Sequence, residues 1–248
     1  MRELIELGKI RDDFQKDLRD WVDIAHTFIE FAKRGMSNMN SNASSDLKIF
    51  THEDKSLKLE TLNRLSYNDM ILIYVNHKGA IAELIYGRML QRWYNFLNQI
   101  IEQIVKYHFA NVKSYPNIYN INKIKIDFSQ DDLSEKLPDF INRFDKINNI
   151  DKIEVVEQCL KQNIDEELKQ EIKKAIITRN LLEHNQGIIR KKDIEGLGSN
   201  SIKLFVDEGS IPIQEKDFTE GERVEITIYE IFCLKETLYN TSKILITE

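Results

Sequence analysis

The sequence predicts an all-α fold, a helical bundle with one small β-hairpin before the last helix. Apolar residues recur at three- and four-residue steps over most of the 248 residues, which is the period of an amphipathic helix. Only 9 Gly and 3 Pro are present, few for a loop-rich or all-β protein. We expect residues 1–64 to form a helical N-terminal extension and residues 65–248 the main helical domain, together making one continuous domain.

The N-terminal half is predicted to contain two long helices. Residues 2–34 keep a helical period, and Gly35 is a typical helix end. Residues 35–46 are polar and of low complexity, which indicates a flexible loop. A short helix is expected over 53–65, and residues 80–110 are predicted to form the long central helix.

The C-terminal half is predicted to be helical with two β-like interruptions. Ile124–Phe128 is a short extended run. Ile202–Val206 and Ile211–Gln214 flank Gly209-Ser210, which indicates the hairpin. The predicted helices span residues 131–147, 151–162, 165–186 and 225–246.

Composition excludes several classes of protein. A net charge of −6 argues against a protein that coats nucleic acid nonspecifically, although an RNA-acting enzyme with a local basic patch remains possible. Cys159 and Cys233 are expected to be buried free thiols of a reducing compartment. The five histidines lie in unrelated segments without metal-ligand spacing, so no metal or other cofactor is predicted. The absence of a membrane-length apolar run and of a signal-peptide pattern predicts a cytoplasmic protein that does not enter a membrane.

An arginine interrupts the apolar stripe of the helix predicted over 165–186. At about 100° per residue, Arg179 falls at the centre of the stripe and Glu183 falls beside it. The apolar members of this stripe are Leu168, Ile172, Ala175, Ile176 and Leu182. A guanidinium at such a position is costly to bury unless it is paired or lines a cavity. The position therefore indicates either an ion pair with Glu183 or a functional site.

The residues after Arg179 resemble the ribonuclease motif of the HEPN family (higher eukaryotes and prokaryotes nucleotide-binding). Arg179 is followed directly by Asn180, and four residues lie between Arg179 and His184, near the end of a penultimate long helix. The resemblance extends to the central helix upstream and to the loop and terminal helix downstream, over roughly residues 65–246. It implies a HEPN-like bundle and a metal-independent endoribonuclease that acts as a homodimer on tRNA or mRNA. A toxin or antiphage defence effector, controlled by an antitoxin or regulatory protein, is the implied role.

The resemblance also implies roles for individual side chains. His184 would act as general base or acid, and Arg179 would hold the scissile phosphate and offset transition-state charge. Asn180 would orient His184 or bond a phosphate oxygen. Glu183 would fix Arg179, and Asn185 is a further supporting residue.

A basic run follows the motif helix. Arg190-Lys191-Lys192 is either a solvated turn or a patch that steers RNA toward the site. In the regulated members of the family, a tyrosine two positions after the histidine is modified. That position is Gln186 in this chain, which puts such control in doubt.

Two further interpretations of the motif remain open. The chain is either a non-catalytic module that binds RNA, a nucleotide or a partner protein, or a helical scaffold in which Arg179 and Glu183 form a buried pair. Ile177 and Leu181 make a second apolar strip on the His184 side of the helix. This strip is either a dimer contact or packs within the same protomer.

Overall fold

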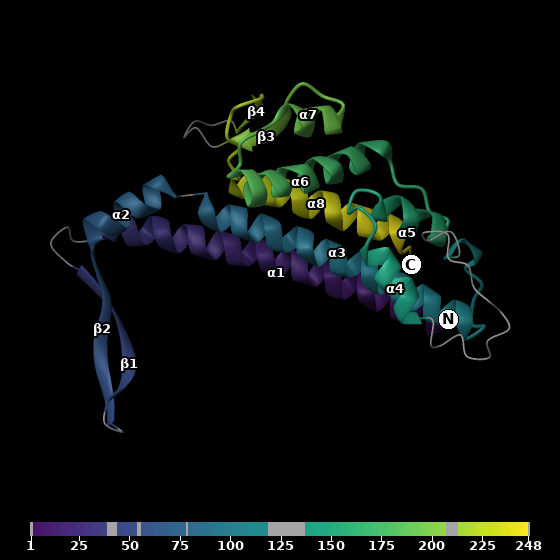
Figure 1. Ribbon diagram of the computed structural model, residues 1–248, viewed down its shortest axis with the longest axis horizontal. Coiled ribbons are helices and arrows are strands. Elements are labelled where there is room, and N and C mark those ends of the chain that lie inside the picture. Colours follow the sequence, from purple (N-terminus) through teal and green to yellow (C-terminus); the bar gives the residue numbers. More distant parts are fainter. Residues whose placement is uncertain are drawn as a thin grey trace.

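Four long helices form the body of the protein (Figure 1). The computed structural model describes residues 2–38, 44–53, 56–77, 79–118, 137–206 and 213–247. The long helices are α1 (Arg2–Asn38), α3 (Ala80–Phe109), α6 (Glu166–Asn185) and α8 (Ile228–Leu245). α3 is the central helix, because it packs against the other three. The mainly helical prediction is therefore confirmed, and the predicted central helix over 80–110 matches α3 within one residue.

The core is densest where α1 crosses the middle of α3. The rings of Phe14 and Phe96 stack with centroids 4.3 Å apart, and Trp93 lies 5.7 Å from Phe14. These rings are fully buried. The Gln15 amide donates a hydrogen bond of 2.9 Å to Ser242 Oγ on α8. The buried side chains of α1, which lie between Leu7 and Ala25, thus belong to the same core as α3 and α8.

Shorter elements cover the ends of the bundle. α4 (Leu137–Asp145) and α5 (Lys152–Leu160) lie within the helices predicted over 131–147 and 151–162. The extended run predicted over 124–128 and the start of the first of these helices lie outside the described residues. α7 (Lys191–Leu197) was not predicted, because seven residues give too little periodicity to recognise.

A hairpin precedes the last helix, as the sequence predicts. β3 (Ile202–Val206) pairs antiparallel with β4 (Gln214–Phe218), and Ile202 lies opposite Phe218. The predicted second strand, Ile211–Gln214, overlaps β4 at Gln214, and residues 211 and 212 lie outside the described part of the chain. Phe218 is buried whereas Ile213 is exposed, so the apolar side chain that anchors β4 lies at its far end. Thr227 Oγ1 donates to the Phe205 carbonyl oxygen at 2.8 Å and thereby ties β3 to the start of α8.

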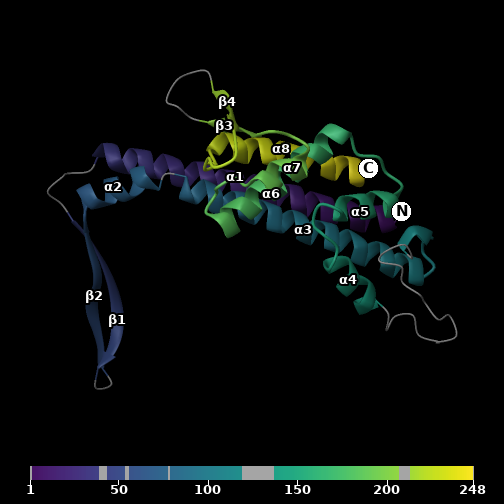
Figure 2. The same cartoon turned by 45° about the horizontal axis from the view of Figure 1, so that its top comes forward.

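The predictions for the region after α1 were wrong. α1 continues through Gly35 to Asn38 instead of ending at Gly35. A second hairpin, β1 (Ser44–Glu53) and β2 (Ser56–Ser66), replaces the end of the predicted 35–46 loop and the helix predicted over 53–65. Residues 39–43 lie outside the described part of the chain. In Figures 1 and 2 this hairpin projects away from the helices.

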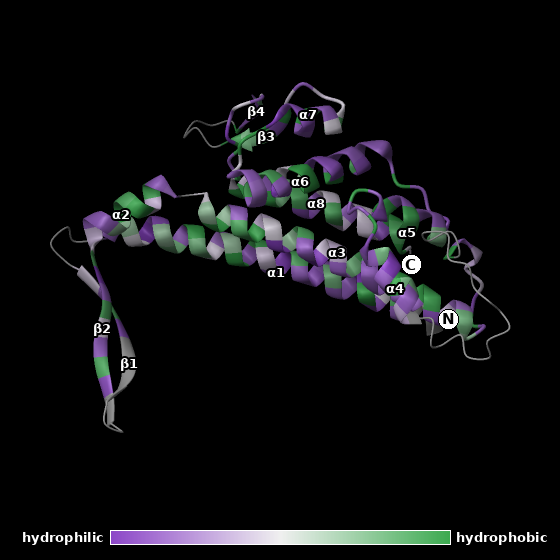
Figure 3. Ribbon diagram, in the orientation of Figure 1, coloured by the Kyte–Doolittle hydropathy of each residue, from purple (hydrophilic) through white to green (hydrophobic). Residues whose placement is uncertain are grey.

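A short helix, α2 (Tyr67–Asn76), leads from this hairpin toward α3. Ser66 begins it, because its hydroxyl accepts a hydrogen bond from the Asp69 backbone N–H at 3.1 Å. α2 is apolar in its middle and polar at both ends (Figure 3), and none of its residues is buried. Among the described residues, no helix is both long enough and apolar enough to cross a membrane.

Candidate functional site: the C-terminal turns of α6

Arg179 occupies the core-facing stripe of α6, as the sequence predicts. Ile172, Ala175 and Ile176 on this stripe are buried, and the Arg179 side chain is 20% exposed. Arg179 Nη2 lies 2.6 Å from Glu183 Oε2, and Arg179 Nη1 donates to Asn180 Oδ1 at 3.2 Å. The guanidinium is therefore fixed by both neighbours. Arg179 Nε is buried and has no hydrogen-bond partner among the described residues.

Tyr94 of α3 completes the surroundings of Arg179. Its side chain is buried. Burial raises the pKa of Tyr94 to about 12. The negative charge of Glu183 adds to this rise, whereas the positive charge of Arg179 and a hydrogen bond with Asn149 oppose it. The charges of Arg179 and Glu183 on α6 thus act on this hydroxyl of α3. The sequence assigns Tyr94 only to the core, because a contact between two helices leaves no pattern in either one.

Gly87 brings the Glu183 carboxylate close to the backbone of α3. A Cβ atom at Gly87 would lie 3.9 Å from Glu183 Oε1, which is ordinary van der Waals contact. Gly87 and Tyr94 are seven residues apart and therefore lie on one face of α3. The site is thus built from two helices, with the Arg179–Glu183 pair of α6 facing Gly87 and Tyr94 of α3.

His184 lies apart from this group. It is exposed and makes no hydrogen bond or ion pair to any residue that the structure describes. Five residues of helix separate it from Arg179 by about 140° around the axis. Asn180 bonds to Arg179 and not to His184, so the role of orienting the histidine is not seen in this structure. Within one protomer, the side chains of Arg179 and His184 therefore face different directions.

The second apolar strip of α6 packs within the protomer. Leu181 is fully buried. A Cβ atom at Gly196 of α7 would lie 3.7 Å from Ile177 Cδ1. The suggestion that Leu181 makes a dimer contact is therefore wrong, because the segment after the helix folds back and covers this strip.

The end of α6 is held by backbone hydrogen bonds. Gln186 and Gly187 have φ of 54° and 80°, and Gly187 N–H donates to the Leu181 carbonyl at 2.9 Å. The following segment pairs with residues 221–224: Val224 N–H donates to the Gly187 carbonyl at 2.9 Å. Asn185 lies at this turn, and its Nδ2 is buried without a hydrogen-bond partner among the described residues. The turn fixes where His184 and Asn185 sit.

Replacement of Gly187 by alanine should destabilise the protein by about 1–3 kcal/mol. The added Cβ would have an unfavourable positive φ and would lie 3.3 Å from the Val224 carbonyl oxygen. Gly198→Ala is the matched control, because Gly198 has φ of 68° and open space around it. Urea unfolding should show a larger loss for Gly187→Ala; equal losses would contradict the importance of the close approach.

Only part of the basic run after α6 is free of contacts with acidic side chains among the described residues. Arg190 Nε and Nη2 donate to the two carboxylate oxygens of Asp193 at 2.9 and 3.0 Å, and the Arg190 backbone N–H also donates to Asp193. The hydrogen bond to Asp193 raises the pKa of Arg190. Arg190 therefore caps the N-terminus of α7. Lys191 lies 3.7 Å from Glu195, and Lys192 is exposed with no ion pair among the described residues.

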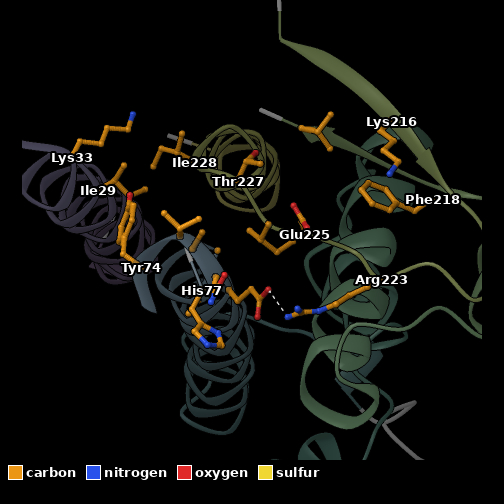
Figure 4. A pocket seen from close by; sticks show the side chains of 18 residues that line it. Ile29, Lys33, Tyr74, His77, Lys216, Phe218, Arg223, Glu225, Thr227 and Ile228 are labelled. Carbon is orange, nitrogen blue, oxygen red and sulfur yellow. Dashed lines mark hydrogen bonds and ion pairs between the residues drawn. The ribbon is translucent and has the colours of Figure 1, made fainter. Parts of the chain in front are cut away.

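A pocket of about 420 Å³ lies beside the site and not at it (Figure 4). It is lined by the end of α1, the α2–α3 junction and residues 223–228, and includes neither Arg179 nor His184. Arg223 Nη2 lies 3.4 Å from Glu83 Oε1 on its wall. Burial raises the pKa of Glu83, Arg223 opposes this, and Glu225 adds to it. Three cations, Lys33, Lys216 and Arg223, and the two carboxylates line the pocket, so its charges nearly cancel.

The structure thus brings Arg179, Asn180, Glu183 and Tyr94 together and leaves His184 on the neighbouring surface. Both cysteines are free, Cys159 being buried and Cys233 half-buried. No group of three or more histidine, cysteine, aspartate or glutamate side chains that could hold a metal ion occurs among the described residues. Comparison with protein-family models, curated proteins and solved structures finds no match to this chain.

Proposed function

We propose that the chain is a metal-independent endoribonuclease of the HEPN type, acting as a toxin or antiphage effector. The observation that carries the proposal is an arginine fixed on the core-facing stripe of α6, one and a half turns before an exposed histidine. Arg179 is oriented by Glu183 and Asn180, as a phosphate-binding guanidinium must be. Its buried Nε has no partner among the described residues.

The chemistry follows from what RNA itself supplies. The 2′-oxygen attacks the adjacent phosphorus, the bond from phosphorus to the 5′-oxygen breaks, and a 2′,3′-cyclic phosphate and a 5′-hydroxyl result. A base removes the 2′-hydroxyl proton, and an acid protonates the leaving 5′-oxygen. His184 is the side chain of this site suited to proton transfer near neutral pH. Arg179 offsets the charge that develops on the phosphorane oxygens.

A homodimer fits this mechanism better than a monomer. One histidine cannot give and take protons in the same step, whereas two copies supply two. His184 and Arg179 of one protomer also face different directions, about 140° apart around α6. Two copies with facing α6 ends can present an arginine from one chain and a histidine from the other to the same phosphate.

The proposal is tested by incubating the purified protein with total RNA in EDTA and mapping the ends of the fragments. We expect cleavage that leaves 2′,3′-cyclic phosphate and 5′-hydroxyl ends. Fragments with 3′-hydroxyl ends would contradict attack by the 2′-oxygen. The absence of cleavage across tRNA, ribosomal RNA and mRNA would contradict the proposed activity.

One observation favours a second candidate function, an RNA- or nucleotide-binding module without catalysis. His184 has no side chain that orients it among the described residues, whereas Arg179 is oriented. This alternative predicts binding without cleavage. Filter binding with wild-type protein and Arg179→Ala should then show affinity that depends on Arg179.

A further inference from the structure

The described residues between 26 and 81, that is 26–38, 44–53, 56–77 and 79–81, form a projecting part of the molecule that we call the arm. The arm comprises the last part of α1, the β1–β2 hairpin, α2 and the first residues of α3. Where the structure describes burial, no residue between Ala25 and Ala82 is buried. Figures 1 and 2 show the hairpin pointing away from the bundle. The arm therefore gains little from the core that holds the other helices in place.

The arm nevertheless exposes many large apolar side chains. They are 40–71% exposed: Phe28, Phe31, Leu47, Leu59, Leu62, Leu72, Ile73, Val75 and Ile81. Two more, Ile24 and Leu84, adjoin its ends. An isolated two-stranded hairpin is marginally stable in water, and apolar surface of this extent marks a contact with another molecule.

The charge of the arm points to a protein as that molecule. Among the residues of the arm whose side chains the structure describes, five are basic and four are acidic: Lys33, Arg34, Lys48, Lys58 and Arg64 against Glu30, Asp46, Glu60 and Asp69. Nucleic acid and anionic membranes select strongly basic surfaces. A nearly neutral apolar surface suits the interior of a protein–protein interface.

The size of the surface matches a dimer. Nine large apolar side chains, each 40–71% exposed, present on the order of several hundred Å² of apolar surface, which is the apolar share of a standard interface. One partner contributes about 800 Å² to a standard stable interface. A second copy of the chain supplies an equal apolar area with the same balanced charges, so a two-fold contact covers both surfaces at once.

We infer that the arm is the surface through which two copies of this chain associate. Ile81 and Leu84 on α3 continue the apolar surface to within one turn of Gly87, beside Glu183. A second copy seated on the arm thus reaches the edge of the Arg179 site. The inference itself rests on exposure, charge and area, and it holds whether or not the protein cleaves RNA.

The test compares two valines of equal exposure. Val75 in the arm and Val112 outside it are each 56% exposed. Light scattering coupled to gel filtration, without RNA, should show a dimer for wild-type protein and for Val112→Asp at about 10 µM. Val75→Asp and Leu72→Asp should dissociate into monomers, with about 100-fold weaker association. Circular dichroism should show wild-type helix content for all three variants.

Two results would overturn the inference. A monomeric wild-type protein at about 100 µM would mean that the arm binds another molecule. Dimers that persist in both arm variants would place the interface elsewhere. A dimer that depends on the arm but cleaves no RNA would contradict the proposed function alone, so the two failures are distinguishable.

Discussion

Replacement of His184 by alanine is expected to lower the rate of RNA cleavage by about 10³-fold or more. General acid–base catalysis by a positioned side chain contributes about 10²–10⁴-fold, and a homodimer loses both of its histidines at once. Because His184 is exposed and makes no hydrogen bond or ion pair among the described residues, its removal should leave the fold intact. Single-turnover cleavage of a labelled RNA measures the rate, and circular dichroism monitors the helices.

Glu195→Ala provides the control for this experiment. Glu195 is an exposed residue of α7, close in sequence to the end of α6, and its contact with Lys191 is 3.7 Å long. Its removal should leave the cleavage rate within about twofold of wild type, since exposed ion pairs contribute little. Wild-type cleavage by His184→Ala would remove the histidine from the proposed mechanism.

Arg179→Met is expected to reduce cleavage by about 10²–10³-fold without lowering the melting temperature. Methionine fills the same stripe as Ile172 and Ile176, and apolar replacements of buried ion pairs are often neutral or stabilising. Glu183 is left without its partner, but its side chain is 41% exposed and stays hydrated. Thermal unfolding followed by circular dichroism should therefore show an unchanged or higher midpoint.

The chain offers a closely matched control in Arg92→Met. The Arg92 side chain is 23% exposed and pairs with Asp17, which is 38% exposed. This pair joins α3 to α1 and is distant in sequence from α6. Its loss should leave cleavage within about twofold of wild type. If Arg179→Met also cleaves RNA at the wild-type rate, the Arg179–Glu183 pair is only structural.

The parts of the fold that the sequence predicts best are those that bury a periodic apolar stripe. α3 and α6 match their predicted ranges, because no break at proline or glycine interrupts the apolar stripe of either helix. The β1–β2 hairpin has no core side to impose a pattern. Leu59, Leu62 and Leu65 recur every three residues, which resembles a helix. Pairing slips between Leu47 and Lys48, and Leu62 is left without a partner, so the strand alternation is broken.

In the candidate site too, the sequence predicts contacts along one helix but not contacts between helices. Spacing along one helix predicts the contact between Arg179 and Glu183, because residues four apart lie on one face. Tyr94 could not be predicted, since its approach to Arg179 depends on how α3 packs against α6. The burial of Leu181 depends on the return of the chain through α7, and this also lies beyond helix periodicity.

Residues 221–227 connect the end of the motif helix to two other parts of the molecule, α3 and β3. Val224 bonds to Gly187, Arg223 pairs with Glu83 on α3, and Thr227 bonds to Phe205 of β3. The same stretch of chain therefore holds α3, β3 and the end of α6 in place relative to one another. A displacement of the β3–β4 hairpin relative to α3 must stretch these contacts and transmit force to the turn that carries His184. The position of the histidine is thus coupled to a hairpin with which it makes no hydrogen bond or ion pair among the described residues.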